Sequence, residues 1–260
     1  MSKIPIAVQL YSVRDECARD LPGTIAKVAA MGYDGVDFAG YYNYSAAELR
    51  KMCDDAGLKV AGTHIGMDTL LGDNLAATIE FNAELGNRFL IVPWINEVER
   101  DSPNACWKTA EVFNGIAGKL APHGMMTGYH NHHAEFTDLG GGLTAWDALF
   151  DQTGPGVVMQ LDTGNGLAGG AKLEEILRRH PGKATTVHLK PYSTVQAAAA
   201  GFEAGYKPLI GADDVPWRAV FDLCEATGGT EWYIVEYESD AFPALEAVDR
   251  CIKILRDWGK

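Results

Sequence analysis

Cysteine is scarce in this chain and is not arranged as a framework. There are five cysteines, an odd number, and no two of them form a C-x-x-C pair. This argues against a disulfide scaffold and against a structural zinc site, both of which need paired, closely spaced cysteines. We expect inert, reduced residues, most of them in helical stretches: Cys17, Cys53, Cys106, Cys224 and Cys251.

Positive charge is also in short supply. Lysine and arginine number 22 against 35 aspartates and glutamates, which gives a formal net charge of -13. The negative electrostatic field of such a chain repels a phosphate backbone, and no cluster of lysines or arginines offsets this repulsion. The charge therefore argues against a nucleic acid or an anionic membrane as the partner. A small neutral or metal-chelating substrate fits better.

Long apolar runs and phosphate loops are missing. No stretch reaches the ~20 apolar residues of a membrane helix, and the start MSKIPIAVQLYSV meets Arg14 and Asp15 before a secretory segment can form. We therefore expect no membrane insertion and a cytoplasmic location. No G-x-G-x-x-G or G-x-x-x-x-G-K-[ST] pattern follows an expected strand, which argues against a doubly wound nucleotide-binding fold.

What the chain does contain is one unit repeated from end to end. Short apolar runs alternate with longer amphipathic stretches, as in strand and helix units around a parallel sheet. Eight of each predict an α/β protein with one domain, a (β/α)8 TIM barrel over residues 1-260. The expected strands are Ile6–Leu10, Gly35–Phe38, Val60–His64, Phe89–Pro93, Met125–His130, Val157–Asp162, Thr185–Leu189 and Tyr233–Glu236. The expected helices are Leu21–Met31, Ala46–Ala56, Leu75–Leu85, Cys106–Ala121, Leu143–Asp151, Leu173–Arg179, Val215–Ala226 and Ala241–Trp258.

Local patterns support these boundaries. Ser45 followed by Glu48 predicts a capping box. Three glycines stand where an expected helix stops and the next strand begins: Gly57, Gly86 and Gly124. The longest irregular stretch, about residues 191–214, lies on a strand-to-helix connection. We expect it to form a partly helical lid.

Ligand-type side chains stand at the ends of three expected strands. They are Asp162, His188 and Glu236. Taken alone, Asp162 could cap a helix and His188 could be an ordinary core histidine. The carboxyl ends of barrel strands, however, meet at one face, where TIM-barrel active sites lie. Carboxylates and an imidazole converging there suit Mn²⁺, Mg²⁺, Co²⁺ or Zn²⁺, so we expect a metal site.

The fifth strand supplies the fourth ligand. Glu135 is preferred, because a carboxylate beyond the strand end can swing over the barrel mouth. His130 or His132 could equally be the ligand, which would leave Glu135 to bind a sugar hydroxyl or to act as a base. Around the mouth, a mixture of aromatic and hydroxyl-binding groups is typical of a carbohydrate site. The candidate substrate-binding residues are Gln9, His64, Trp94, His132 and Lys190.

Seven segments together resemble a known family over essentially the whole chain: QLYSVR, MGYDGVDF, GTHIG, GYHNHHAEF, LDTGN, VHLKP and WYIVEYE. The chain is similar to the sugar phosphate isomerase/epimerase family with its xylose isomerase-like TIM barrel. It is most similar to the members with a YHNH segment, a set that resembles inosose dehydratases and enzymes of keto-sugars and keto-glycosides.

The resemblance implies one divalent metal, often Mn²⁺, held by Glu, Asp, His and Glu from four strands. Asp162, His188 and Glu236 match the last three. The fifth strand departs from the pattern: where many relatives have a ligating Glu, this chain reads Tyr129-His130-Asn131-His132. The first ligand and the two-carboxylate epimerase mechanism are therefore open.

The predicted function is a metal-dependent isomerase or epimerase of a ketose or keto-sugar. A metal that chelates a ketone oxygen and the adjacent hydroxyl acidifies the neighbouring C–H and holds the enediolate. A base removes the proton, with His130, Glu135 and Glu236 as the expected catalytic groups. Return of the proton gives isomerisation or epimerisation.

Loss of a β-oxygen would instead make the protein a lyase or dehydratase of a keto-sugar, an inosose or a 3-keto-glycoside. A non-phosphorylated substrate is favoured, because only Gly201, Gly205, Lys207 and Gly211 hint at a phosphate loop. An abasic-site endonuclease with three zinc ions and a non-catalytic sugar binder are remote alternatives. Assembly into a homo-oligomer is left open.

Overall fold

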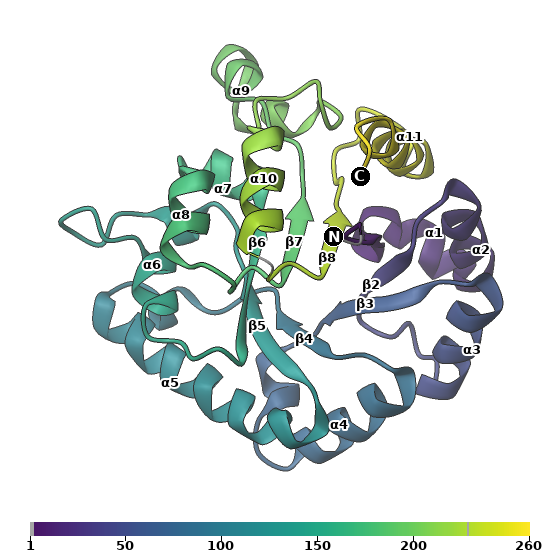
Figure 1. Ribbon diagram of the computed structural model, residues 1–260, viewed down its shortest axis with the longest axis horizontal. Coiled ribbons are helices and arrows are strands. Elements are labelled where there is room, and N and C mark those ends of the chain that lie inside the picture. Colours follow the sequence, from purple (N-terminus) through teal and green to yellow (C-terminus); the bar gives the residue numbers. More distant parts are fainter. Residues whose placement is uncertain (1–2, 228) are drawn as a thin grey trace.

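Eight parallel strands close into a barrel in the computed structural model, which describes residues 3–227 and 229–260 (Figure 1). Each strand pairs with the next one along the chain, and β8 closes the ring against β1. The strands are β1 Ile6–Gln9, β2 Gly35–Ala39, β3 Lys59–His64, β4 Phe89–Val92, β5 Met126–His130, β6 Val157–Asp162, β7 Thr186–Leu189 and β8 Trp232–Val235. The predicted (β/α)8 barrel is confirmed, with strand ends that differ by one residue at most.

Helices surround the barrel (Figure 1). Within the described residues they are α1 Arg14–Arg19, α2 Leu21–Met31, α3 Ala46–Ala56, α4 Asn74–Leu85, α5 Pro103–Leu120, α6 Ala145–Phe150, α7 Thr163–Ala168, α8 Leu173–Arg179, α9 Thr194–Ala200, α10 Trp217–Thr227 and α11 Ala244–Asp257. All eight predicted helices are present. The prediction missed α1 and α7 and described α9 only as part of the lid, because six or seven residues are too few to establish an amphipathic repeat.

Helix boundaries follow the predicted local chemistry. Ser45 accepts a hydrogen bond from the Glu48 backbone, and the Glu48 carboxylate accepts one from the Ser45 N–H, so the capping box at α3 is confirmed. The glycines at the ends of α3 and α4 and before β5 adopt the left-handed conformation, with φ of 70°, 81° and 68°. A residue with a Cβ is strained there. Each of the five cysteines lies in a helix and is buried as a thiol.

Side chains along each strand point alternately into and out of the barrel, and the inward ones fill it in two layers. Near the amino ends, the inward positions are apolar and form their own cluster, with Ala7, Ile91, Val158 and Ile234 among its members. Residues two positions further along a strand face the same way. The next inward layer, toward the carboxyl ends, is polar, and it contains the candidate site. Apolar packing below therefore supports a polar mouth above.

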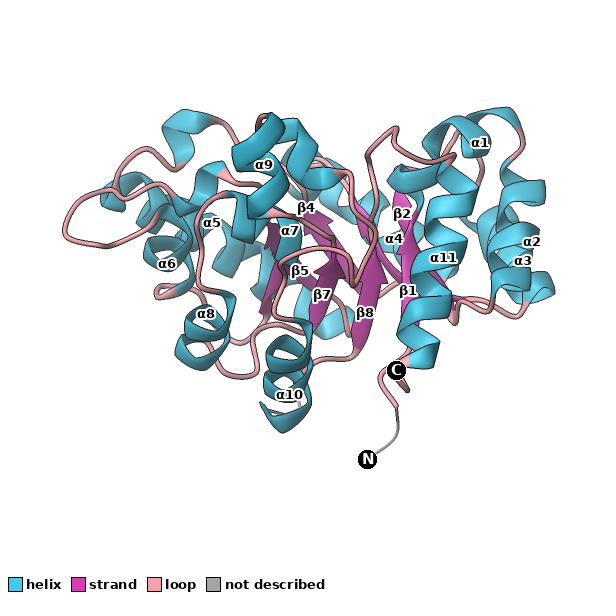
Figure 2. Cartoon of the chain, turned by 90° about the horizontal axis from the view of Figure 1, so that it is seen from above, coloured by secondary structure: helices cyan, strands magenta, loops and turns pink. Residues whose placement is uncertain are grey.

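The connection between β7 and α10, residues 191–214, is the predicted lid. It contains α9 and a short 3-10 turn, Phe202–Tyr206, and its two halves are joined by a hydrogen bond from Ser193 N to Gly205 O. Figure 2 shows α9 beyond the carboxyl ends of the strands, whereas the C-terminus lies on the opposite side. Among the described residues, no helix has the length and apolar character needed to cross a membrane.

Candidate metal centre

Four side chains from adjacent strands meet inside the mouth of the barrel. His130, Asp162, His188 and Glu236 each offer a ligand atom, and these atoms all lie within 4.8 Å of one another. His130 and Asp162 are the last residues of β5 and β6, His188 lies in β7, and Glu236 follows β8 directly. All four are buried. Three are the ligands predicted from strand ends, and His130 takes the fourth place.

The chemistry of this cluster fits a divalent cation. Oδ1 of Asp162 accepts a hydrogen bond of 2.7 Å from the backbone N of Asn165, whereas Oδ2 is buried without a hydrogen-bond partner. Nε2 of His130 is 3.8 Å from that orphaned oxygen. A buried, unpartnered carboxylate oxygen is expensive unless a cation compensates it. Two imidazoles and two carboxylates are a donor set for Mn²⁺, Zn²⁺ or Co²⁺.

Gln160 fixes the orientation of His130. Its amide oxygen lies 3.1 Å from Nδ1 of His130 and 2.6 Å from Nε2 of His64, while its amide nitrogen donates to Thr186 at 3.0 Å. An oxygen acceptor at Nδ1 places the proton there and leaves the Nε2 lone pair of His130 available to a metal. Burial, together with His188, holds the pKa of His130 well below its usual range. The ring is therefore neutral, as a ligand must be.

Asp37 orients His188 in the same way. Its Oδ2 lies 3.2 Å from Nε2 of His188 and accepts a 2.9 Å hydrogen bond from Nε2 of Gln9. Nδ1 of His188 faces Glu236 at 2.6 Å. Burial lowers the pKa of His188, but the hydrogen bonds to Asp37 and Glu236 outweigh it and raise that pKa to about 9. Gln9 is thus fully buried as the support of Asp37, behind the cluster.

Neither Asp37 nor Gln160 was singled out from the sequence. The signal was present, because both occupy inward positions of otherwise apolar strands, in VDFA and VMQLD. Gly62 on β3 makes room for Asp37, since a Cβ at Gly62 would stand 2.7 Å from Oδ1 of Asp37.

Lys190 supplies the buried positive charge of the site. Its Nζ lies 3.7 Å from Asp162 Oδ2 and 3.6 Å from Glu236 Oε1, and it pairs with Glu238. Burial disfavours ionisation of Glu236, but Lys190 and His188 outweigh it and hold its pKa well below the usual range. Burial raises the pKa of Asp162 to about 7 against the pull of Lys190. The two carboxylates thus differ in proton affinity although both lie near Lys190.

Glu135, the preferred fourth ligand of the sequence analysis, lies apart from this cluster. Its carboxylate forms an ion pair of 3.0 Å with Nε of Arg100, accepts a 2.8 Å hydrogen bond from the Tyr129 hydroxyl, and accepts one of 2.7 Å from the backbone N of His132. The expected swing over the mouth does not occur because these three donors hold the carboxylate on the outer side of β5. His130, one of the open alternatives, stands in the cluster instead.

The remaining expected residues surround the cluster at different depths. The His64 ring stacks on His188 with centroids 5.2 Å apart. The His132 ring lies 5.3 Å from that of His130, and its Nδ1 is buried without a partner. Trp94 is 59% exposed and follows β4 by two residues. Of the substrate-binding candidates, His64, His132 and Lys190 therefore border the site directly.

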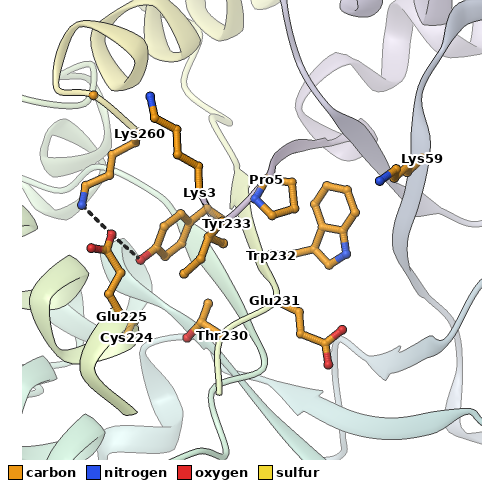
Figure 3. Close-up of a pocket in the computed structure, with 12 residues that line it drawn as sticks. Lys3, Pro5, Lys59, Cys224, Glu225, Thr230, Glu231, Trp232, Tyr233 and Lys260 are labelled. Carbon is orange, nitrogen blue, oxygen red and sulfur yellow. Dashed lines mark hydrogen bonds and ion pairs between the residues drawn. The ribbon is translucent and has the colours of Figure 1, made fainter. Parts of the chain in front are cut away.

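A cavity of about 590 Å³ lies next to the cluster, and its lining includes His132 and Lys190, which border the cluster. It reaches the site through His132, Asn165 and Lys190, and the lid forms its outer wall. A slightly larger cavity, about 620 Å³, lies at the other end of the barrel around Tyr233 and Lys260 (Figure 3). That end carries the starts of the strands and none of the cluster residues, and in TIM barrels it contributes to stability. The cavity beside the cluster is the candidate substrate site.

Comparisons with known proteins agree with this architecture. A family model described as xylose isomerase-like TIM barrel matches residues 25–258. An inosose dehydratase from Geobacillus thermodenitrificans is 23% identical in an alignment 253 residues long, and the match covers 85% of this chain and 82% of that protein. A sugar phosphate isomerase/epimerase from Parabacteroides distasonis has a structure with a TM-score of 0.83 at 21% identity, covering 98% of this chain and 94% of the other.

A D-allulose 3-epimerase from Methylomonas sp. in complex with D-allulose matches with a TM-score of 0.70 at 11% identity, over 99% of this chain and 98% of the other. At these identities the structural likeness establishes the fold and leaves the reaction to be argued from the site.

Proposed function

Because the chain belongs to the xylose isomerase-like TIM barrel family, we propose that it is a divalent-metal-dependent enzyme that removes the proton next to the carbonyl of a ketose or keto-sugar. The observation that carries the proposal is the buried cluster of His130, Asp162, His188 and Glu236, with an orphaned oxygen on Asp162. Relatives named for sugar epimerisation and inosose dehydration support a small sugar as the substrate. A non-phosphorylated sugar fits the acidic chain best.

The four cluster residues would hold one metal ion, for which Mn²⁺ is the first candidate and Mg²⁺, Co²⁺ and Zn²⁺ are the alternatives. When bound, such an ion would supply a Lewis acid that polarises the substrate carbonyl and stabilises the enediolate. Asp37 and Gln160 keep the two imidazoles in the tautomers that ligation needs. Burial of the cluster strengthens every charge interaction within it.

Proton transfer falls to the groups that line the cavity. His132 borders both the cluster and the cavity, and burial together with Lys190 lowers its pKa, so its ring is neutral and able to accept a proton. Lys190 also lines the cavity. Burial disfavours its charge, but Glu236, Asp162 and Glu238 outweigh burial and hold its pKa well above the usual range, so it stays an ammonium that can stabilise the charge on a leaving or returning oxygen. Glu236 is the second candidate base. His130 changes from the expected catalytic role to that of a ligand.

The position of Glu135 favours a β-elimination over an epimerisation in which two carboxylates act as bases. Epimerisation by proton return needs a base on each face of the substrate, and Glu135 with Glu236 was the expected pair. The carboxylate of Glu135 is held by Arg100 and the His132 backbone, away from the cluster. One base, His132, and one cation, Lys190, suffice: His132 removes the α-proton, Lys190 stabilises the departing β-oxygen, and that oxygen takes its proton from the His132 imidazolium or from water. A lyase of a keto-sugar, inosose or 3-keto-glycoside is therefore the favoured outcome, ahead of isomerisation by a single shuttling base.

The test combines metal analysis with proton exchange. The purified protein is chelated, reloaded with Mn²⁺, Co²⁺ or Zn²⁺, and incubated in heavy water with an inosose, D-allulose and a 3-keto-glucoside while proton NMR follows each substrate. We expect about one metal per chain and chelator-sensitive exchange of the α-proton, followed by loss of the β-substituent. Exchange with formation of an epimer or isomer would identify an isomerase. Absence of both metal and exchange under every condition would contradict the proposal and leave a sugar-binding barrel.

A further inference from the structure

The candidate substrate cavity runs from the residues that border the metal cluster outward to the lid. Its inner end is formed by His132, Asn165 and Lys190, and its outer wall is formed by Phe202 and Tyr206 of the lid. Cavities of ~300 to 1,000 Å³ hold ligands of drug size, and this one measures about 590 Å³. A monosaccharide bound at the cluster would leave the outer part, beneath the lid, open to a further group.

Phe202 presents an aromatic surface to this outer part. It is 41% exposed although three rings surround it, those of His133, Tyr206 and Tyr192 at centroid distances of 5.0, 5.7 and 6.0 Å. The contacts with His133 and Tyr206 are edge-on, at 65° and 74°. Tyr206 is itself fixed by a hydrogen bond of 3.1 Å from its hydroxyl to Asn165. The phenyl ring is therefore held in place while much of its surface stays uncovered.

The charges around the outer cavity argue for an uncharged occupant. Lys190 is already paired with Glu238 at the inner end. In the outer part, the cavity is lined by one ammonium, Lys207, and by two carboxylates, Glu203 and Asp240. No excess of positive charge is left there to bind a phosphate or a carboxylate. An aromatic ring within a neutral or slightly acidic wall instead suits a ring with an apolar face, through stacking and burial of apolar area.

We propose that Phe202, supported by His133 and Tyr206, forms an outer subsite for a second, uncharged ring attached to the sugar. The ring is a glycosyl or an aryl group in a glycosidic substituent, and its attached sugar occupies the inner site. The inference rests on the proposed function for the inner site only. It names the substrate class as a glycoside or disaccharide derivative, and it assigns Phe202 the role of selecting it.

Binding of inert glucosides tests the subsite without turnover. Methyl β-D-glucopyranoside, phenyl β-D-glucopyranoside and cellobiose are titrated by calorimetry into the full chain, in chelator and again with Mn²⁺. We expect the phenyl glucoside, cellobiose or both to bind about 3- to 10-fold more tightly than the methyl glucoside. Preference for the phenyl compound alone identifies an aryl subsite, and preference for cellobiose alone identifies a glycosyl subsite.

Phe202→Ala should abolish the preference, so that the three glucosides bind with similar affinity. Val195→Ala is the matched control, because Val195 is 68% exposed on α9 of the same lid and does not line the cavity. Equal affinities in the parent protein, or a preference that survives Phe202→Ala, would overturn the subsite. Metal-dependent turnover without a preference would defeat the subsite alone, whereas a Phe202-dependent preference without metal binding would defeat the proposed function alone.

Discussion

Nε2 of His188 lies 3.2 Å from Oδ2 of Asp37, so a carboxylate from β2 orients an imidazole from β7 across the inside of the barrel. The two residues are 151 positions apart in the chain. Both are fully buried. The contact explains how one ring nitrogen of His188 can face the candidate metal position while the other has a fixed partner.

Asp37→Asn should weaken metal binding by about 10- to 100-fold and leave the fold intact, because the amide keeps the shape of the side chain but loses the charge that orients His188. Competition with a chromogenic chelator measures the affinity at about pH 10, where His188 is deprotonated in both proteins and proton competition does not mask the loss. Asp34→Asn is the control, since Asp34 stands just before the same strand and serves Ile6 and Arg256 at the far end of the barrel. Equal affinities for the two variants would show that Asp37 has no role in binding.

Asp162→Asn should lower metal affinity by more than about 100-fold, since it replaces a charged ligand by a neutral amide. Asparagine is also a good N-cap, so the hydrogen bond from Asn165 that begins α7 is retained and circular dichroism should not change. Metal content after dialysis measures the loss. Asp147→Asn, on α6 beside His180, removes a partly buried carboxylate elsewhere and should keep the metal. Full metal content in Asp162→Asn would remove this residue from the ligand set.

Glu135→Gln should retain the metal but reduce turnover, because Glu135 lies outside the cluster and holds the backbone of His132. It should also lower the free energy of unfolding by about 3 kcal/mol, since Arg100 loses its carboxylate while its side chain is only 17% exposed. His130→Ala should instead lose the metal, because it removes one of the four cluster residues. Metal loss from Glu135→Gln with retention in His130→Ala would return Glu135 to the ligand role.

The double variant Arg100→Met/Glu135→Gln separates two effects of Glu135: the stability that comes from its ion pair with Arg100, and the turnover that depends on its hold on the His132 backbone. Removing both charges should cost less stability than the sum of the two single variants, with an interaction of about 1 kcal/mol or more in urea unfolding. Turnover should stay as low as in Glu135→Gln. Strict additivity would mean that the two charges do not interact.

Metal affinity should rise with pH between about 7 and 9. In the metal-free protein the pKa of His188 is raised to about 9 against the effect of burial, because Asp37 and Glu236 stabilise the imidazolium. The protonated ring cannot bind a metal, so each binding event below this pKa must release a proton, and the dependence should level off above it. Burial raises the pKa of Asp162 to about 7, which steepens the dependence near and below that pH.

Calorimetry in two buffers with different ionisation enthalpies measures the number of protons released. We expect close to one proton released per metal ion bound at pH 8, and a number that falls toward zero above about pH 10. Asp37→Asn should move this profile to lower pH, because His188 loses one of the two carboxylates that raise its pKa. A release that does not vary with pH would contradict the role of His188.

The pattern of apolar and polar residues along the sequence was sufficient to predict the barrel. The strands at residues 157–162 and the helices at 21–31, 46–56 and 173–179 have the predicted boundaries, because alternating apolar runs, caps and C-terminal glycines are local signals. Short helices such as α7 were missed because they depend on one cap, the side chain of Asp162, and on tertiary packing.

The candidate site was only partly contained in the sequence. Asp162, His188 and Glu236 could be chosen because strand ends in a barrel converge, which is a property of the fold class. The choice between His130 and Glu135 could not be made, since it depends on Arg100, which lies 35 residues before Glu135 in another connection and holds its carboxylate. The roles of Asp37 and Gln160 likewise depend on partners from distant strands. Local periodicity thus determined which residues face inward, whereas three-dimensional packing decided which of them meet, because hydrogen bonds and ion pairs act over a few ångströms irrespective of distance along the chain.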